Sequence, residues 1–345
     1  MIDPNSINWN ELGFAYKPTR SMYIARCKAD ETWKKGDLVP FGDIPMSPAA
    51  CVLNYGQGLF EGLKAYRCKD GSIQLFRPTE NAKRIAMGCE RLCIPPLTEE
   101  VFMDGIMKVA NDNKDFVPPY REDSLSQGSL YFRPLVWGTS PLLGVKSASE
   151  FTFVVFCCPV GPYFKNGFKP IKLKIVSGYH RAAPGCTGGV KAIGNYAGGM
   201  LPAKQAKEEG FSEILYLDAK DKKYLEEVGA ANFFCIRGNS ILTPELDGAI
   251  LPGITRKSIL HIAADRFGMK VEERKVSLEE ALTADEAFAS GTAAVISPIG
   301  AIYYDGKDYV LGDGTPGKRT VELYKALTSI QHGLEQDPYG WIVRL

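Results

Sequence analysis

The stretch FTFVVFCCPVGPYFKNGFKPIKLKIV, residues 151 to 176, divides the chain into two strand-rich halves. Its first eight residues form an apolar run that is too short to cross a membrane and is typical of a buried strand. The next twelve hold three prolines and two lysines, which is the composition of a connector, and the last six indicate another strand. We therefore predict a first domain over 1–162, a connector over 163–170 and a second domain over 171–345.

Length and composition agree with two ordinary globular domains. A chain of 345 residues exceeds the size at which a single hydrophobic core keeps growing. Hydrophobic residues make up 45% of it, and 41 basic residues balance 40 acidic ones for a net charge of +1. No basic run suggests contact with nucleic acid, and no apolar run suggests a membrane. Small molecules are the expected partners.

The nine cysteines show no CxxC pair and no Cys/His cluster at zinc spacing. We interpret them as buried thiols of a reducing compartment and predict no metal site. The N-terminal stretch MIDPNSINWNELGF lacks both the basic start with an apolar stretch that marks export and the Arg/Ser-rich pattern of an organelle signal. The expected location is the cytoplasm.

Periodicity predicts an α/β protein of the α+β type in both halves. In the first half we expect strands at 21–27, 72–77, 129–137 and 151–158, and helices at 79–94 and 98–110. In the second half we expect strands at 171–176, 212–218, 232–243 and 286–300. The expected helices there lie at 199–209, at 255–267 with Gly268 as C-cap, after the capping box SLEE at 277–280, and at 317–333.

One glycine-rich stretch, GQGLFEG at 56 to 62, superficially resembles a dinucleotide-binding fingerprint. Its third glycine lies one residue too far along for G-x-G-x-x-G, and the preceding SPAACVLNY is not a clean apolar strand. A dinucleotide-dependent oxidoreductase therefore remains only an alternative. We interpret the stretch as a turn softened by glycine.

A second glycine-rich stretch, TGGVKAIGNYAGGM at 187 to 200, surrounds Lys191 with small residues. An amine does covalent chemistry when its charged form is disfavoured and a carbonyl compound can reach it, and flanking glycines permit that approach. A surface lysine in a flexible loop has the same pattern. A lysine that binds pyridoxal phosphate also needs an acid at the pyridine nitrogen, a donor at the phenolic oxygen and a phosphate cup.

Candidates for these three helpers occur elsewhere in the chain. Tyr196 could donate to the phenolic oxygen, and Glu227 in YLEEVGAAN could hold the pyridine nitrogen. The helix that LPGITRKSIL begins offers the amides of Ile254 and Thr255 to a phosphate. Thr292 and Ala293 lie in a second turn of small residues. Each feature also has a common structural explanation: an exposed acid, a capped helix or a simple turn.

Together these stretches closely resemble the branched-chain amino acid aminotransferases, a family of fold-type IV pyridoxal phosphate enzymes. The resemblance extends from about Tyr16 to Trp341. Its most specific stretches are YGQGLFEGLKAYR (55–67), LFRPTENAKRI (75–85), LYFRPLVWG (130–138), GGVKAIGNY (188–196), LEEVGAANFF (225–234), LPGITRKSI (251–259) and SGTAAVISP (290–298). The resemblance implies a smaller N-terminal α+β domain and a larger, strand-rich, pseudo-barrel C-terminal domain that binds the cofactor.

The resemblance also implies roles for individual residues. Lys191 would be the catalytic lysine that forms the Schiff base and later carries the proton. The cofactor-binding residues would be Arg84, Lys191, Tyr196, Glu227, Ile254, Thr255 and Thr292, with Arg84 at the phosphate. The substrate-binding residues would be Tyr55, Phe60, Tyr131, Arg133, Tyr163 and Ala293. Leu143 and Val145 would enter the site of the neighbouring subunit in a homodimer.

The implied activity moves an amino group between L-leucine, L-isoleucine or L-valine and 2-oxoglutarate. Two activities of the same fold remain open on the lysine and glutamate alone, namely a D-amino acid transaminase and an aminodeoxychorismate lyase. The stretches YFRP and FEGLKAYR favour the branched-chain group. Because period-two alternation places Tyr131 and Arg133 on one face of their strand, both are expected to point at the substrate.

Overall fold

The structure is a computed structural model, and it describes residues 3–122, 127–161 and 168–345. The chain forms two compact units. The first comprises Met1–Lys165 with the segments Val190–Gly194 and Ile330–Leu345, and the second comprises Asn166–Gly189 and Asn195–Ser329. The break after Lys165 falls within the predicted connector. The sequence prediction assigned 171–345 to one domain, whereas here two segments of that range pack with the first unit.

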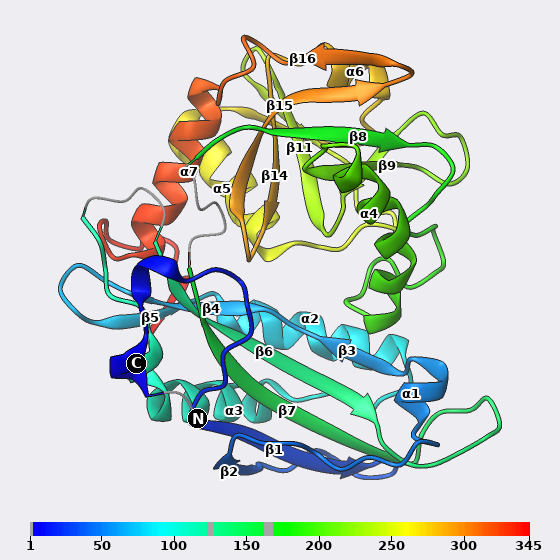
Figure 1. Cartoon of the computed structure of the whole chain (residues 1–345), viewed down its shortest axis with the longest axis vertical. Coiled ribbons are helices and arrows are strands. Elements are labelled where there is room, and N and C mark those ends of the chain that lie inside the picture. Colours follow the sequence, from blue (N-terminus) through cyan, green and yellow to red (C-terminus); the bar gives the residue numbers. More distant parts are fainter. Residues whose placement is uncertain (1–2, 123–126, 162–167) are drawn as a thin grey trace. The chain divides into compact units, whose positions relative to one another are not determined.

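The first unit is built on one antiparallel sheet, in the order β17-β5-β4-β6-β7-β1-β2 with β3 beside β6. Its strands are β1 Ser21–Lys28, β2 Asp37–Pro40, β3 Gly58–Phe60, β4 Leu63–Arg67, β5 Ile73–Phe76, β6 Ser129–Gly138, β7 Glu150–Val160 and β17 Ile342–Arg344. The long strands β6 and β7 pair along their whole shared length (Figure 1). The stretch at 56–62, expected to be a turn, contributes β3 because its pairing with β6 outweighs the low strand propensity of glycine.

Alternation along β6 gives the sheet two different faces. Leu130, Phe132 and Val136 are fully buried, whereas Tyr131 and Arg133 are only half-buried on the other face. The buried face is covered by α2 (Pro78–Arg91) and α3 (Glu99–Asp112). Tyr131 and Arg133 thus share the face that the helices do not cover.

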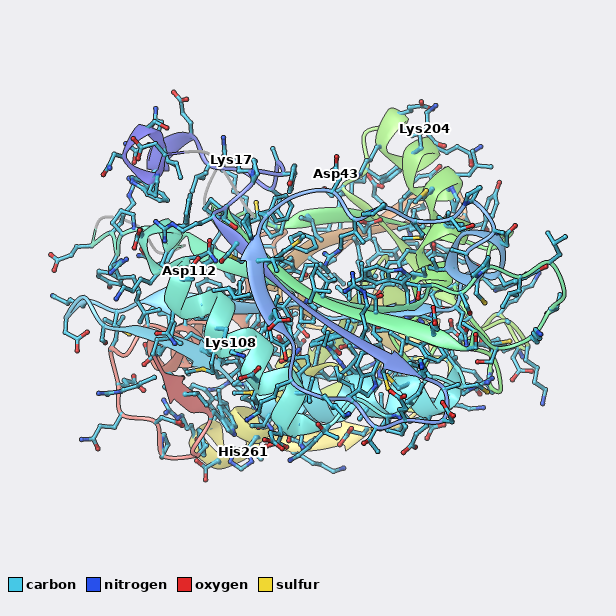
Figure 2. All side chains as sticks on the ribbon, turned by 90° about the horizontal axis from the view of Figure 1, so that it is seen from below. Lys17, Asp43, Lys108, Asp112, Lys204 and His261 are labelled. Carbon is cyan, nitrogen blue, oxygen red and sulfur yellow. The ribbon has the colours of Figure 1, made fainter. Side chains whose placement is uncertain are left out.

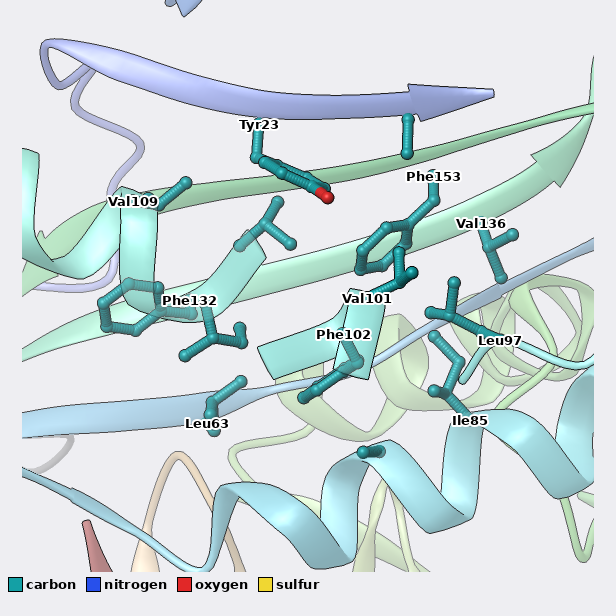
Figure 3. Packing of buried hydrophobic residues seen from close by; sticks show 14 of the residues in the cluster. Tyr23, Leu63, Ile85, Leu97, Val101, Phe102, Val109, Phe132, Val136 and Phe153 are labelled. Carbon is teal, nitrogen blue, oxygen red and sulfur yellow. The ribbon is translucent and has the colours of Figure 1, made fainter. Parts of the chain in front are cut away.

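Sequence signals explain where the two helices begin. Pro78 occupies the first turn of α2, where its missing N–H costs nothing. Thr98 caps α3 by accepting a hydrogen bond from Val101 N at 3.3 Å. Figure 3 shows Phe102 from α3 close to Phe153 of β7, and their rings stack at 6.1 Å between centroids. This packing makes the first unit a helix layer on a sheet.

The remaining helical elements of the first unit are short. They are η1 Pro4–Ser6, η2 Trp9–Glu11, α1 Cys51–Tyr55 and η3 Lys114–Phe116.

The second unit is built on a sheet that curls back on itself. Its order is β10-β9-β8-β15-β14-β11-β12-β13, with β16 beside β15, and β10 also pairs with β11. Six strands therefore form a closed ring. The strands are β8 Ile171–Val176, β9 Glu213–Leu217, β10 Leu225–Val228, β11 Ala231–Arg237, β12 Ser240–Thr243, β13 Lys270–Glu273, β14 Glu286–Gly291, β15 Val295–Tyr304 and β16 Lys307–Val310. The pairings mix parallel and antiparallel strands. The barrel-like sheet implied by the resemblance is confirmed.

The predicted strand at 286–300 is two strands, because residues 292–294 form a turn between β14 and β15. The helices and 3-10 turns of this part of the chain are η4 Ile193–Gly199, α4 Met200–Glu208, α5 Ile254–Phe267, α6 Leu278–Leu282 and α7 Lys318–Gln331. Gly268 ends α5 in the left-handed conformation at φ 57°, as the sequence predicts. Ser277 and Glu280 form the predicted capping box at α6.

Charged side chains of both signs are spread over the surface, as Figure 2 shows for Lys108 and Asp112 on α3 and for Lys204 on α4. Over the ranges 3–122, 127–161 and 168–345, no helix has both the length and the apolar character needed to cross a membrane. Within the same ranges, no three His, Cys, Asp or Glu side chains are grouped so that they could hold a metal ion.

Candidate active site

Lys191 belongs to the segment Val190–Gly194, which packs with the first unit against β3. Phe60 N donates to the carbonyl oxygen of Lys191 at 3.2 Å, and Leu59 forms an isolated bridge with Ala192. The Lys191 Nζ lies 4.6 Å from the centroid of the Phe60 ring. Strand β3 therefore holds the backbone of the lysine and places an aromatic ring beside its amine.

The two glycines before the lysine, Gly188 and Gly189, lie in the second unit, where Gly188 meets the backbone of residues 248–249. A Cβ on Gly188 would lie 2.1 Å from Ala249 O, which no side chain tolerates. Close backbone packing thus requires Gly188, a reason that the sequence analysis did not consider. Thr187 and Asn195 hydrogen-bond to each other at 2.6 and 2.7 Å and so join the two ends of the segment that carries Lys191.

Arg133 and Tyr131 share the Phe60 ring with the lysine. The guanidinium carbon of Arg133 lies 4.6 Å from the centroid of Phe60 and 5.4 Å from that of Tyr131, and Arg133 Nη2 donates to Tyr131 Oη at 3.3 Å. Gly62 accommodates this tyrosine, since a Cβ there would lie 2.1 Å from Tyr131 Oη. Three predicted site residues thus lie around one ring with Lys191.

Arg133 has no carboxylate partner within the described part of the chain, and its Nε is buried without a hydrogen bond. A structural arginine would have an acid beside it. The arrangement instead presents a half-buried cation between two aromatic rings, which is suited to a carboxylate that arrives from outside.

Two residues next to these aromatic rings were missed by the sequence analysis. The Phe14 ring meets Tyr131 edge to face at 6.0 Å, and Lys64 Nζ lies 6.0 Å from the centroid of Phe14. Burial lowers the pKa of Lys64 to about 7. A buried lysine in an alternating strand is a signal that the sequence offers, but a solvated strand lysine has the same pattern.

Arg84 is buried on α2 and is held by Glu61, a residue that sequence reasoning did not single out. Its Nε and Nη2 each donate to a carboxylate oxygen of Glu61 at 2.7 Å. Glu61 follows Phe60, so the same short segment contacts Lys191 and Arg84.

The predicted residues nearer the surface of the first unit lie around the turn at 141–147. Leu143 is 86% exposed and Val145 is 85% exposed. Tyr55 ends α1, and its hydroxyl donates to the carbonyl oxygen of Leu143. Tyr163 lies outside the described residues.

In the second unit, Glu227 is 2% exposed on β10 and is held as a carboxylate by two neighbours. Arg181 Nη2 lies 2.7 Å from Glu227 Oε2, and Asn232 Nδ2 donates to Glu227 Oε1 at 2.9 Å. Asn232 also donates to Leu251 O, and Arg181 donates to Ala249 O at 2.6 Å. Both partners are thus fixed by the loop before α5. Neither was identified from the sequence, because they lie far from Glu227 in the loop order or carry no motif.

The neighbouring Glu226 has a different environment. Burial, followed by the charge of Asp247, raises its pKa to about 8, and its Oε2 is buried without a hydrogen bond. Of two consecutive buried glutamates, only Glu227 has a cation in ion-pair contact.

The start of α5 fits an anionic group. Gly253 is its N-cap and forms no side-chain capping bond, so a side chain does not cover the first-turn amides, which include those of Ile254 and Thr255. A Cβ on Gly253 would lie 2.0 Å from Asn232 Oδ1, so the helix start and the Glu227 partner come together only with glycine there.

The other predicted residues of the second unit lie in turns. Tyr196 is half-buried in η4. Thr292 and Ala293 form part of the turn between β14 and β15. Val295, which follows that turn, has φ 60°, a conformation that a β-branched residue rarely adopts and that often marks a functional site.

Comparisons with known proteins agree with this arrangement. Residues 58–302 match the family described as amino-transferase class IV. The chain is 50% identical over 340 residues to branched-chain-amino-acid aminotransferase 3, chloroplastic, of Arabidopsis thaliana, covering 98% of this chain and 81% of that one. It is 43% identical over 343 residues to branched-chain amino acid aminotransferase 1, mitochondrial, of Humulus lupulus, covering 99% and 86%.

Solved structures of branched-chain aminotransferases have the same fold. The enzyme from the archaeon Thermoproteus uzoniensis, solved with norvaline, gives a TM-score of 0.78 at 27% identity, covering 94% of this chain and 99% of that one. A bacterial-type relative solved with pyridoxamine 5'-phosphate gives a TM-score of 0.78 at 26% identity, covering 95% and 99%.

The chain belongs to the class IV aminotransferases, the class that the barrel-like sheet and the Lys191 segment define. Within that class its family is that of the branched-chain-amino-acid aminotransferases, and the sequence prediction of this enzyme is confirmed. Its cofactor is pyridoxal phosphate. The donor set fits this group: a buried carboxylate for a ring nitrogen, a lysine amine, a buried arginine and a helix start without a side-chain cap.

The predicted cytoplasmic location is wrong. The plant relatives are named chloroplastic or mitochondrial, which points to an organelle. The physical reason is that a folded domain carries no address in its composition. Location is encoded in targeting segments, which are separate from the fold.

Proposed function

We propose that the chain transfers an amino group between L-leucine, L-isoleucine or L-valine and 2-oxoglutarate, with Lys191 as the residue that joins pyridoxal phosphate in a Schiff base. The observation that carries the proposal lies in the first unit. Lys191 Nζ and the Arg133 guanidinium each lie 4.6 Å from the centre of the Phe60 ring. One aromatic ring therefore adjoins both a reactive amine and a cation for a second carboxylate.

We propose that the cofactor is held by the residues expected from the sequence. Glu227 would hold the pyridine nitrogen, Tyr196 the phenolic oxygen, and Arg84 the phosphate. The amides of Ile254 and Thr255 and the Thr292 hydroxyl complete the phosphate set. When bound, pyridoxal phosphate supplies an electron sink for the bonds at the amino acid α-carbon. Because Arg181 and Asn232 keep Glu227 charged, this carboxylate can keep a ring proton in place.

The chain's own residues supply the proton chemistry and the pocket. Lys191 Nζ, once released from the cofactor, would take the proton from the substrate α-carbon and return it on the other side of the reaction. Phe60, Tyr131, Tyr55 and Ala293, with Tyr163, would form an aromatic and apolar pocket for a branched side chain. Such a pocket excludes water from the α-carbon.

Glutamate requires a further element, because an unpaired carboxylate is costly to bury in an apolar pocket. We propose that Arg133 receives it. Leucine would leave the guanidinium on the Phe60 and Tyr131 rings, where it lies in this structure.

We also propose that the enzyme is a homodimer, in which Leu143 and Val145 enter the site of the neighbouring subunit. Both side chains are almost fully exposed in the single chain, on a turn that Tyr55 ties to α1. Exposed aliphatic residues on a fixed turn are typical of a contact surface.

The test is a panel of L-amino acids, with methionine and D-alanine added, each assayed for glutamate formation from 2-oxoglutarate. Turnover of leucine, isoleucine and valine, with none of D-alanine, is the expected result. D-alanine turnover would support a D-amino acid transaminase, and release of an aromatic amine from aminodeoxychorismate would support the lyase. A visible absorbance band without added nicotinamide separates all three from a dinucleotide-dependent enzyme.

A further inference from the structure

Glu61 is the most completely buried carboxylate beside the predicted cofactor residues. Its exposed fraction is 0%, and it follows the last residue of β3. Arg84 Nε and Nη2 donate to its two oxygens at 2.7 Å, Asn81 Nδ2 donates to Oε2 at 2.8 Å and Gly62 N donates to Oε2 at 3.2 Å. A buried carboxylate with this many donors is a built element of the fold.

The charge balance around Glu61 keeps it ionised. Burial acts to raise the pKa of Glu61, but the charge and hydrogen bonds of Arg84, the charge of Lys191 and the Asn81 bond outweigh burial, so that its pKa is lowered. The carboxylate therefore stays negative between two cations of the first unit. A buried pair of this kind is a weak source of stability but fixes one geometry well.

The geometry of the pair fixes the plane of the guanidinium. Glu61 binds the Nε and Nη2 edge of Arg84, and a fork held at two points cannot rotate about its last bond. These two contacts use two of the five N–H donors of the arginine. The same short segment also fixes Lys191, through the bond from Phe60 N to its carbonyl oxygen.

We propose that Glu61 is a positioning residue for the cofactor phosphate, acting through Arg84. It holds the guanidinium in the single orientation in which the arginine meets the phosphate, and it balances the charge of the arginine when the site is empty. The proposal rests on the proposed phosphate role of Arg84. It assigns to Glu61 a selective effect on the phosphate, not a general effect on the fold.

The test compares the affinity of the full-length chain, stripped of cofactor, for pyridoxal phosphate and for pyridoxal, which lacks the phosphate. The variant Glu61→Gln keeps the shape of the side chain but turns one of the two acceptors into a donor that faces Arg84. We expect its Kd for pyridoxal phosphate to rise at least about tenfold, or 1.4 kcal/mol, with less than about a twofold change for pyridoxal. Glu61→Asp keeps the charge with a shorter reach and should fall between the two.

The matched control is Glu90→Gln, an exposed acid on the same helix as Arg84. It should bind both compounds as the unchanged chain does. If Glu61→Gln does not fold, Asn81→Ala takes its place, because it removes one donor to the same carboxylate and should raise the Kd for pyridoxal phosphate alone by a smaller factor. Thermal unfolding of each variant without cofactor shows whether the fold is intact.

Equal losses for pyridoxal phosphate and pyridoxal, or no loss in a folded Glu61→Gln variant, would overturn the positioning role. The proposed function fails differently. If the unchanged chain does not bind pyridoxal phosphate, the cofactor assignment itself is wrong. If the unchanged chain prefers pyridoxal phosphate to pyridoxal and Glu61→Gln keeps that preference, only the inference on Glu61 is wrong.

Discussion

Replacing Arg133 with methionine should separate the two kinds of substrate. Methionine retains the length and apolar stem of the side chain and removes the charge. In the structure Arg133 contacts only the rings of Phe60 and Tyr131 and the Tyr131 hydroxyl within the described residues, so the change breaks no ion pair of the fold. The loss of activity should therefore come from the substrate side.

The expected magnitude follows from what each substrate loses. Glutamate and 2-oxoglutarate lose a charge-assisted contact to a half-buried guanidinium, at about 2 to 3 kcal/mol, or about 30- to 150-fold. Leucine loses only the ring support that the cation gives, at about 1 kcal/mol or less, or about fivefold at most. The glutamate half-reaction should thus fall by about tenfold more than the leucine half-reaction.

The assay follows each half-reaction separately in stopped flow by the absorbance change of the cofactor. Arg26→Met on β1, an exposed arginine of the same sheet, is the control and should change neither rate. Equal losses for leucine and glutamate would refute the reasoning, because Arg133 would then support the shared α-carboxylate or the fold.

Four further predictions can be checked with simple variants. Lys191→Ala should abolish transamination while cofactor remains bound after gel filtration, and turnover near the unchanged level would rule out its catalytic role. Glu227→Gln should slow the chemical step by about 100-fold or more, measured in a single turnover with cofactor saturating. Gly62→Ala places a Cβ 2.1 Å from Tyr131 Oη and should cost about 1 to 3 kcal/mol of stability by thermal unfolding; an unchanged Tm contradicts it. The raised pKa of Glu226, about 8 against 4.5 for an unperturbed group, means that the folded state holds a proton that the unfolded state has lost. Stability should thus fall as pH rises from about 5 to 8, by at most about 1.4 kcal/mol per pH unit, and Glu226→Gln should flatten that fall in Tm.

Much of the fold follows from local pattern. The helices α3 and α5 and the capping box at Ser277 are written in residues three or four apart, and tertiary contacts only confirm them. The alternation of Tyr131 and Arg133 likewise follows from a period of two, and the structure shows these side chains in contact. Such features need no knowledge of distant residues.

Other features depend on partners that no local pattern names. Strand β3 was missed because two glycines and a glutamate surround it, and only its pairing with β6 makes it a strand. Glu61 gave no signal, because a carboxylate within a glycine-rich stretch normally faces water, and its arginine lies 23 residues further on. Asn232 and Arg181 were missed for the same reason. The catalytic assignment of Lys191 came from the family resemblance and not from the glycines, one of which serves packing alone.

The assignment of residues 330–345 to the first unit has a consequence for how the chain is made. Strand β17 at 342–344 pairs with β5 at 73–76, so an edge of the first sheet remains uncovered on the ribosome until almost the whole chain has been synthesised. The second unit, by contrast, can close its ring of strands as soon as β15 has emerged. Synthesis order and folding order are therefore opposed. The half that starts first finishes last, and during that interval its bare strand edge is the part of the nascent protein most exposed to aggregation and most in need of a chaperone.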